Sequence, residues 1–191
     1  MPVGQRTRAE FEREVLPHLD DAYGFARWLT RNPADAADVA QEACLRAWRF
    51  FDGFNGTNAR TWLLAIVRNT AHTWLAAQRR LEPVGGLEAP ALDPGPDRLS
   101  EIPGAQLPAD PETMLRRVEE RALLTRLVEA LPHDFREVLV LREVEDLSYR
   151  EIATVVGVPI GTVMSRLGRA RQLLRQGWQR EDQEEPVNGP R

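Results

Sequence analysis

Two short apolar patterns near the C-terminal end predict a pair of helices joined by a tight turn. Ile152, Val155 and Val156 recur at helical spacing, and Gly157 follows them as the residue best suited to a left-handed turn. Pro159 then suits the first turn of a new helix. A second apolar stripe recurs within that helix at steps of four, three and four residues: Val163, Leu167, Ala170 and Leu174. The pattern predicts a helix-turn-helix.

A different face of the second predicted helix carries short polar and arginine side chains. Thr162, Ser165, Arg166 and Arg169 fall at positions i, i+3, i+4 and i+7. An apolar stripe behind and these side chains in front suit the major groove of DNA, so these residues, with Arg171, are candidates for reading bases. Two alternatives stay open: an ordinary helical hairpin whose arginines only solvate its outer face, and an Arg171 that only complements the carbonyl end of its helix.

Two longer helical patterns are predicted nearer the N-terminus. The first follows Asn32 and Pro33, and Asp35 and Asp38 after them suit a helix start. Its polar face carries Asp35, Asp38, Gln41 and Glu42. Its apolar face is predicted to be buried and consists of Ala36, Ala40, Ala43, Cys44, Ala47, Trp48 and Phe51.

The second pattern is a polar loop, residues 54–58, followed by a helix predicted from Arg60 to Arg80. Phe54 at the edge of the loop and the arginines of the helix suit a separated DNA strand, because aromatic rings stack on bases while cations hold phosphates. Trp62 and Trp74 form a stripe with Ile66 and Ala77, which favours a place in the core over base stacking.

An acidic, proline-rich segment separates these patterns. Residues 82–112 hold half of the 14 prolines and seven acidic residues against one arginine, and no apolar periodicity continues through them. We therefore predict an all-α protein with an N-terminal domain at 7–80, a flexible linker at 81–111, a C-terminal domain at 112–178 and a disordered acidic tail at 179–191. No strand or internal repeat is predicted.

Charge is distributed in blocks, although the net charge is −4. Residues 53–81 hold four arginines and no acid, and residues 148–180 hold six arginines and one glutamate. This segregation suits an anionic partner such as nucleic acid despite the negative sum. The lone Cys44 excludes an internal disulfide, and no apolar run is long enough to span a membrane, so we expect a soluble, cytoplasmic protein.

No pattern typical of an enzyme is present. His18, His72 and His133 lie at no metal-ligand spacing, and each is expected to be an ordinary core or surface residue. No glycine-rich phosphate loop follows a strand, and no nucleophile lies in a recognisable elbow. We expect no catalysis, no cofactor and no metal.

The sequence of the C-terminal patterns, "LREVEDLSYREIATVVGVPIGTVMSRLGRARQLLR", resembles the promoter-reading domain of bacterial sigma factors of the extracytoplasmic-function (ECF) type, and the resemblance runs from about Pro111 to Arg175. The N-terminal pattern "DAADVAQEACLRAW" resembles the helix with which these sigma factors dock on RNA polymerase. The resemblance implies a helix-turn-helix that reads the minus-thirty-five element.

The same resemblance implies partners and sites. Core RNA polymerase would contact the polar face of the first helix, and an anti-sigma factor is an expected partner. The minus-ten strand would be held by Phe54, Asn58, Arg60, Asn69 and Arg80, with a base flipped into a pocket. The acidic linker would thread the polymerase channel that later carries RNA. Thr73 stands where an aspartate is frequent in the family, which leaves the preferred bases open.

Two other function classes remain as alternatives to a sigma factor. One is a helix-turn-helix regulator that binds duplex DNA as a dimer, which the sigma-like N-terminal pattern disfavours. The other is a sigma-like decoy that occupies an anti-sigma factor, which the intact arginine face disfavours.

Overall fold

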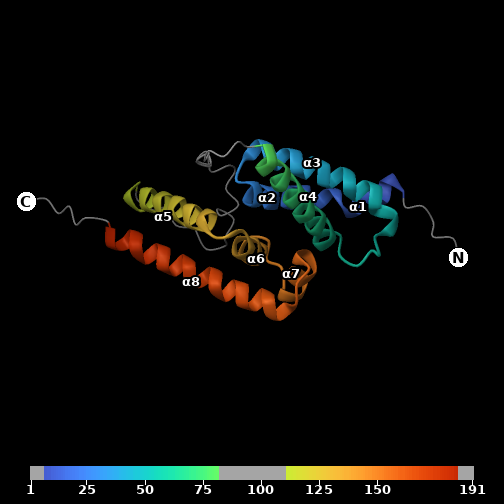
Figure 1. The fold of residues 1–191 in the computed structure, drawn as a ribbon. Coiled ribbons are helices and arrows are strands. Elements are labelled where there is room, and N and C mark those ends of the chain that lie inside the picture. The colour runs from blue at the N-terminus through green and yellow to red at the C-terminus, as the bar shows by residue number, and fades with distance from the viewer. Residues whose placement is uncertain (1–6, 82–110, 185–191) are drawn as a thin grey trace, which may run out of the picture.

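The computed structural model describes residues 7–81 and 111–184, and over these ranges the chain is helical, with no strand (Figure 1). The prediction of an all-α protein is confirmed. The elements in chain order are α1 (Arg8–Glu14), η1 (Leu16–His18), α2 (Leu19–Thr30), α3 (Pro33–Phe50), η2 (Phe51–Gly53), α4 (Ala59–Leu81), α5 (Pro111–Ala130), α6 (His133–Glu143), α7 (Tyr149–Val156) and α8 (Ile160–Glu184).

Helix α3 begins where the sequence predicts. The side chain of Asn32 accepts hydrogen bonds from the backbone N–H groups of Ala34 and Asp35, at 2.8 and 3.2 Å, and Pro33 occupies the first helical position. These contacts satisfy two amide groups that have no partner inside the helix. The cap therefore fixes the direction of the polar face of α3.

The N-terminal helices pack around one core. α2, α3 and α4 contact one another, and their buried side chains include Phe25, Val39 and Leu63. The predicted buried face of α3 is confirmed at Ala36, Ala43 and Ala47, whereas Ala40 and Cys44 are half-buried. Trp48 is 44% exposed, because it lies at the edge of the bundle with its ring edge-on to Phe11.

The C-terminal helices form the predicted helix-turn-helix. α7 ends at Gly157, whose φ of 72° is the left-handed conformation that favours glycine, and α8 follows. Val163, Leu167 and Ala170 are buried, so α8 is held by its apolar stripe as predicted. α6 packs against α7 and α8, and α5 packs against α8.

The two groups of helices lie against each other, with α4 in contact with α7 and α2 in contact with α6 (Figure 1). Residues 179–184 continue α8, so the predicted disordered tail is wrong for that stretch. Residues 82–110 and 185–191, where the linker and the rest of the tail are predicted, lie outside the described residues. Among the helices described, none combines the length and the apolar character needed to cross a bilayer.

Candidate nucleic-acid interface and the contact between the domains

Part of the predicted base-reading face of α8 is open to solvent. Ser165 and Arg169 are exposed and Thr162 is half-buried. The hydroxyl of Ser165 donates to the carbonyl oxygen of Thr162 at 2.9 Å, and the guanidinium of Arg169 donates to Gln172 at 2.9 Å. Both contacts are local to α8 and lie on the surface, so these side chains can exchange them for contacts with DNA.

The other two arginines of this set already pair with acids of their own domain. Arg166 lies 2.6 Å from Asp134 and 3.4 Å from Glu137, and only 20% of its side chain is exposed. Arg171 pairs with Glu143 at 2.7 Å. Hydrogen bonds to Glu143 and Tyr149 raise the pKa of Arg171. The structure therefore separates the five predicted residues into an open set and a paired set.

Glu137 of α6 is the centre of a polar cluster between the domains. Its side chain is 0% exposed, and it accepts hydrogen bonds from the Nε and Nη2 atoms of Arg68 on α4, at 2.8 and 3.2 Å. Burial alone would raise the pKa of Glu137, but hydrogen bonds from His72 and Arg68 outweigh burial and lower it. The carboxylate is thus held ionised between the two domains.

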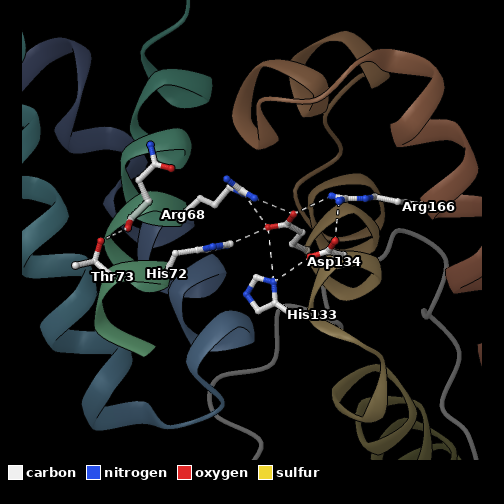
Figure 2. Close-up of polar contacts among 8 residues, drawn as sticks. Arg68, His72, Thr73, His133, Asp134 and Arg166 are labelled. Atoms are coloured by element: carbon white, nitrogen blue, oxygen red, sulfur yellow. Dashed lines mark hydrogen bonds and ion pairs between the residues drawn. The ribbon is translucent and has the colours of Figure 1, made fainter. Parts of the chain in front are cut away.

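Two histidines complete this cluster (Figure 2). Nε2 of His72 lies 3.4 Å and Nδ1 of His133 lies 3.9 Å from Glu137 Oε2, and the two rings meet edge-on with centroids 4.6 Å apart. Burial lowers the pKa of His133. His72 and His133 are expected from the sequence to be unrelated residues at no metal-ligand spacing. That expectation is wrong for this pair, since sequence spacing does not report contacts between domains. His133 and Glu137, four residues apart on one helix, are the signal that could have found half of the cluster.

A second set of polar contacts joins the loop predicted to hold the minus-ten strand, and the start of α4, to the C-terminal domain. Asn58 accepts from the backbone N–H of Thr61 at 3.0 Å, and so caps α4, while its Nδ2 donates to Glu151 at 2.8 Å. Arg60 pairs with Asp21 at 2.7 Å and with Glu145 at 2.6 Å. Two predicted minus-ten residues are therefore occupied by the other domain.

The remaining minus-ten candidates lie in different environments. Phe54 is only 6% exposed; its ring stacks on Phe51 and lies tilted against Trp62, with ring centroids 5.9 and 4.9 Å apart. Asn69 and Arg80 are exposed on α4. Phe54 thus contributes to the core here, because three aromatic rings share one small hydrophobic space. Trp62 and Trp74 are half-buried and pack against the buried cluster, in partial agreement with their predicted core positions, whereas Ala77 of the same predicted stripe is exposed.

The predicted polymerase-docking residues gather on one surface. Asp38, Gln41 and Glu42 line a shallow depression together with Leu45 and Trp74, while Asp35 lies in the first turn of α3. Glu42 also pairs with Arg46 at 2.7 Å. Three apolar side chains on α3 are also exposed: Leu45, Trp48 and Phe50. Their exposure is not predicted from the sequence, because only polar residues are expected on the outer face of this helix.

A buried arginine, also missed from sequence, strengthens the contact between α2 and α6. Arg136 is 5% exposed, and its Nη1 donates to the backbone carbonyl of Trp28 at 3.5 Å. Burial, together with the nearby charge of Arg31, lowers its pKa to about 10. The charge is kept because Glu129 partly compensates it.

The helix-turn-helix, its open polar face and the four-helix N-terminal unit define the class of protein. Family models for Sigma-70 region 2 and for Sigma-70, region 4 match residues 15–81 and 121–174 respectively. The first range covers the helices that carry the minus-ten and docking candidates, and the second covers the helix-turn-helix. The chain thus has the two conserved regions of a sigma-70 type transcription factor.

Curated relatives identify the family more closely. The chain is 41% identical over 144 residues to the ECF RNA polymerase sigma-E factor of Escherichia coli K12, which covers 73% of this chain and 72% of that protein. It is 36% identical to the RNA polymerase sigma-H factor of Pseudomonas aeruginosa, over 90% and 88% of the two chains. The protein belongs to the ECF RNA polymerase sigma factors.

Solved structures agree with this assignment. The sigma factor RpoE of Bartonella quintana, in complex with the anti-sigma factor NepR, aligns with a TM-score of 0.68 and 25% identity, covering 89% of this chain and 97% of that one. CnrH, in complex with the cytosolic domain of CnrY, aligns with a TM-score of 0.60 and 22% identity over 91% and 90%, and shares the fold. As a sigma factor, the protein acts in transcription initiation by RNA polymerase.

Proposed function

We propose that the protein recruits core RNA polymerase to a promoter by reading the minus-thirty-five element with α8 and holding the minus-ten non-template strand with residues 55–58 and α4. The observation that carries this proposal is the helix-turn-helix with its apolar stripe buried and Ser165 and Arg169 open to solvent. The protein supplies binding and strand capture in the cytoplasm, and polymerase supplies the chemistry.

The packing of the domains implies that the protein opens before it binds a promoter. Asn58 and Arg60 of the minus-ten surface bind Glu151 and Glu145 of the C-terminal domain. These carboxylates occupy donors that a phosphate backbone would use, and both cannot be bound at once. We call the packed form the closed arrangement, and we infer that assembly with polymerase exchanges it for an open one.

We also propose an anti-sigma factor as a regulatory partner. The related sigma factor from Bartonella quintana was solved in complex with one, and the likeness covers nearly the whole chain. A partner that favours the closed arrangement would keep the promoter-binding residues occupied and so block initiation.

The docking surface is proposed to be the outer face of α3. Carboxylates at Asp38 and Glu42 beside exposed Leu45 and Trp48 give it the mixed polar and apolar character of a protein interface. Charge reversal at both, D38K with E42K, should impair binding to core polymerase while leaving helix content and melting temperature unchanged, because exposed charges contribute little to stability.

The matched control for this surface is Glu12→Lys on α1. Glu12 pairs with Arg8 four residues away, as Glu42 pairs with Arg46, but it lies outside the proposed surface. Equal affinity of the double variant and of E12K for core polymerase, measured by fluorescence anisotropy, would place the docking surface elsewhere.

A reconstituted transcription assay tests the function as a whole. Core polymerase with this protein should initiate from a matched promoter, whereas a dimeric helix-turn-helix regulator would bind the duplex without supporting initiation. A decoy would bind an anti-sigma factor and direct no transcription. Absence of initiation by a protein that binds core polymerase and opens would contradict the proposal.

A further inference from the structure

The polar cluster between the domains has the geometry of a metal-binding site. His72 on α4 and His133 and Glu137 on α6 each offer one metal-binding atom there, and these three atoms lie within 4.8 Å of one another. The histidine nitrogens closest to Glu137 Oε2 are His72 Nε2 and His133 Nδ1. Oε2 lies 3.4 Å from the first nitrogen and 3.9 Å from the second. A tetrahedral zinc ion with bonds of about 2.0–2.1 Å separates its ligands by about 3.4 Å. The arrangement is therefore close to a coordination site without any rearrangement of the backbone.

We propose that His72, His133 and Glu137 form a binding site for a zinc-type divalent transition metal that bridges the two domains. Two imidazole nitrogens and one carboxylate oxygen suit zinc and cobalt rather than magnesium or calcium, which prefer oxygen alone. The fourth position of the tetrahedron is left to water, as at other zinc sites with three protein ligands.

The surrounding side chains hold Glu137 in the required position. A carboxylate oxygen has two lone pairs, so Oε2 can accept from Arg68 Nε, at 2.8 Å, and still coordinate a cation. Oε1 faces Arg68 and Arg166 at 3.2 and 3.4 Å. Hydrogen bonds of this kind to a ligating carboxylate are the usual outer partners of metal sites.

The charges near the site set its expected strength. Arg68 and Arg166, together with Arg136, whose charge acts on His133, oppose a dication. Glu137 and Asp134 partly offset them, and Asp134 pairs with Arg166 at 2.6 Å. This balance is less favourable than that of a site with several anionic ligands, so we expect micromolar affinity. A metal of such affinity is exchangeable, as a regulatory ion must be.

Binding here would stabilise the closed arrangement, because the ligands come from both domains. One of the three is on α4 and two are on α6, so the complete set exists only while these helices are packed together. The site itself stands on its geometry alone, whereas its effect on promoter binding rests on the proposed function.

Cobalt absorption and zinc calorimetry on the full chain test the site. We expect Co²⁺ to produce the visible d–d bands of tetrahedral coordination, and His72→Gln or His133→Gln to weaken Zn²⁺ binding at least ~10-fold. His18→Ala is the matched control, since it removes the remaining histidine, which lies outside the cluster beside Asp21. It should bind Zn²⁺ as the unchanged protein does.

Three results would overturn the metal site. One is equal Zn²⁺ affinity in all three variants, with circular dichroism showing that each is folded. Another is a sulfur-to-cobalt charge-transfer band, which would assign the ion to Cys44, on α3. The last is the absence of any binding at millimolar Zn²⁺.

Small-angle scattering tests the effect of the metal on the domains. At a salt concentration that separates them, Zn²⁺ should reduce the radius of gyration of the unchanged protein and of H18A, but not of H72Q. A bound metal without this reduction would overturn the bridging role. The scattering result does not depend on promoter activity. The metal can thus fail to bridge the domains while the proposed function holds, or bridge them while the proposed function is wrong.

Discussion

Arg166 and Arg169 lie less than one turn apart on α8, yet their surroundings differ. Arg166 pairs with two acids of α6, whereas Arg169 is exposed and binds only Gln172. A paired guanidinium must break its ion pairs before it contacts a base, and an exposed one gives up little more than water. Arg169 is therefore the better candidate for direct base readout.

We predict that Arg169→Ala weakens binding of the protein, assembled with core polymerase, to a minus-thirty-five duplex by about 1–3 kcal/mol. Arg180→Ala is the control, because that exposed arginine lies three turns further along α8. Fluorescence anisotropy with matched and mismatched duplexes measures both. Loss of affinity that is the same for R180A, or no loss for R169A, would remove Arg169 from the reading face.

Phe54 and Asn69 are both predicted to hold the minus-ten strand, but Phe54 lies in the core and Asn69 lies on the surface. Phe54 stacks within the core, so Phe54→Ala should lower the free energy of unfolding by about 3–5 kcal/mol. Asn69 is exposed, and Asn69→Ala should change stability by less than about 0.5 kcal/mol. Urea denaturation followed by circular dichroism measures both changes, and a fully stable F54A would show that the ring is not part of the core.

The Asn69 variant should also be impaired in promoter opening. Asn69→Ala should still assemble with core polymerase but give weaker permanganate reactivity at the minus-ten element, since extruding a base costs a few kcal/mol that its pocket must offset. Normal reactivity in N69A would exclude Asn69 from strand capture.

At the scale of the elements, α7 depends on its N-terminal cap. Ser148 accepts from the backbone N–H of Glu151 at 3.3 Å, and Glu151 accepts in return from the backbone N–H of Ser148 at 2.8 Å. Hydrogen bonds from the Ser148 hydroxyl and backbone lower the pKa of Glu151 below its usual value of 4.5. Because α7 supports α8, this cap contributes to the position of the reading face.

We predict that Ser148→Ala lowers the free energy of unfolding by about 1 kcal/mol at neutral pH. A lowered carboxyl pKa gives stability that is present above the unfolded pKa and is lost as the pH falls through the folded value. The difference between S148A and the unchanged protein should therefore shrink as the pH falls below 4.5. Denaturation at several pH values measures it, and a difference that stays constant down to pH values well below 4.5 would contradict the role of Glu151.

At the scale of the whole molecule, ion pairs join the two domains. Arg60 and Arg68 of α4 face Glu145 and Glu137 of the C-terminal domain, at 2.6 and 2.8 Å. Residues 53–81 contain arginines and no acid, a pattern that the sequence associates with DNA. In the closed arrangement, acids of the C-terminal domain thus partly neutralise the positive charge of these arginines. Such pairs weaken as salt shortens the screening length, except where they are fully buried.

We predict that the radius of gyration rises as the salt concentration is raised from about 0.1 to 1 M, where the Debye length falls from about 10 to 3 Å. Glu145→Gln should shift this opening to lower salt, because Arg60 then loses the carboxylate of the C-terminal domain with which it pairs at 2.6 Å. Glu143→Gln removes the partner of Arg171 within one domain and should leave the transition unchanged. Small-angle scattering curves that superimpose for E145Q and E143Q would contradict the role of the Arg60 pair.

The sequence by itself determined the helices and the apolar stripe by which α8 packs against its domain. The apolar stripe of α8, the glycine after α7 and the Asn32–Pro33 start of α3 are local signals, and the structure confirms each because helix periodicity and capping depend on neighbours within a few residues. The prediction of a disordered tail was wrong at residues 179–184, since α8 continues through an acidic stretch without an apolar stripe.

Only the tertiary structure decided which side chains meet. Arg60 and Glu145 are 85 residues apart, and His72 and Glu137 are 65 apart, on opposite sides of the linker. No periodicity connects such positions, because their contact depends on how two complete domains pack. Packing within the N-terminal domain placed Phe54, a predicted surface residue, in the core against Phe51 and Trp62. Packing between the domains brought His72 and His133 together with Glu137, which is the basis of the proposed metal site.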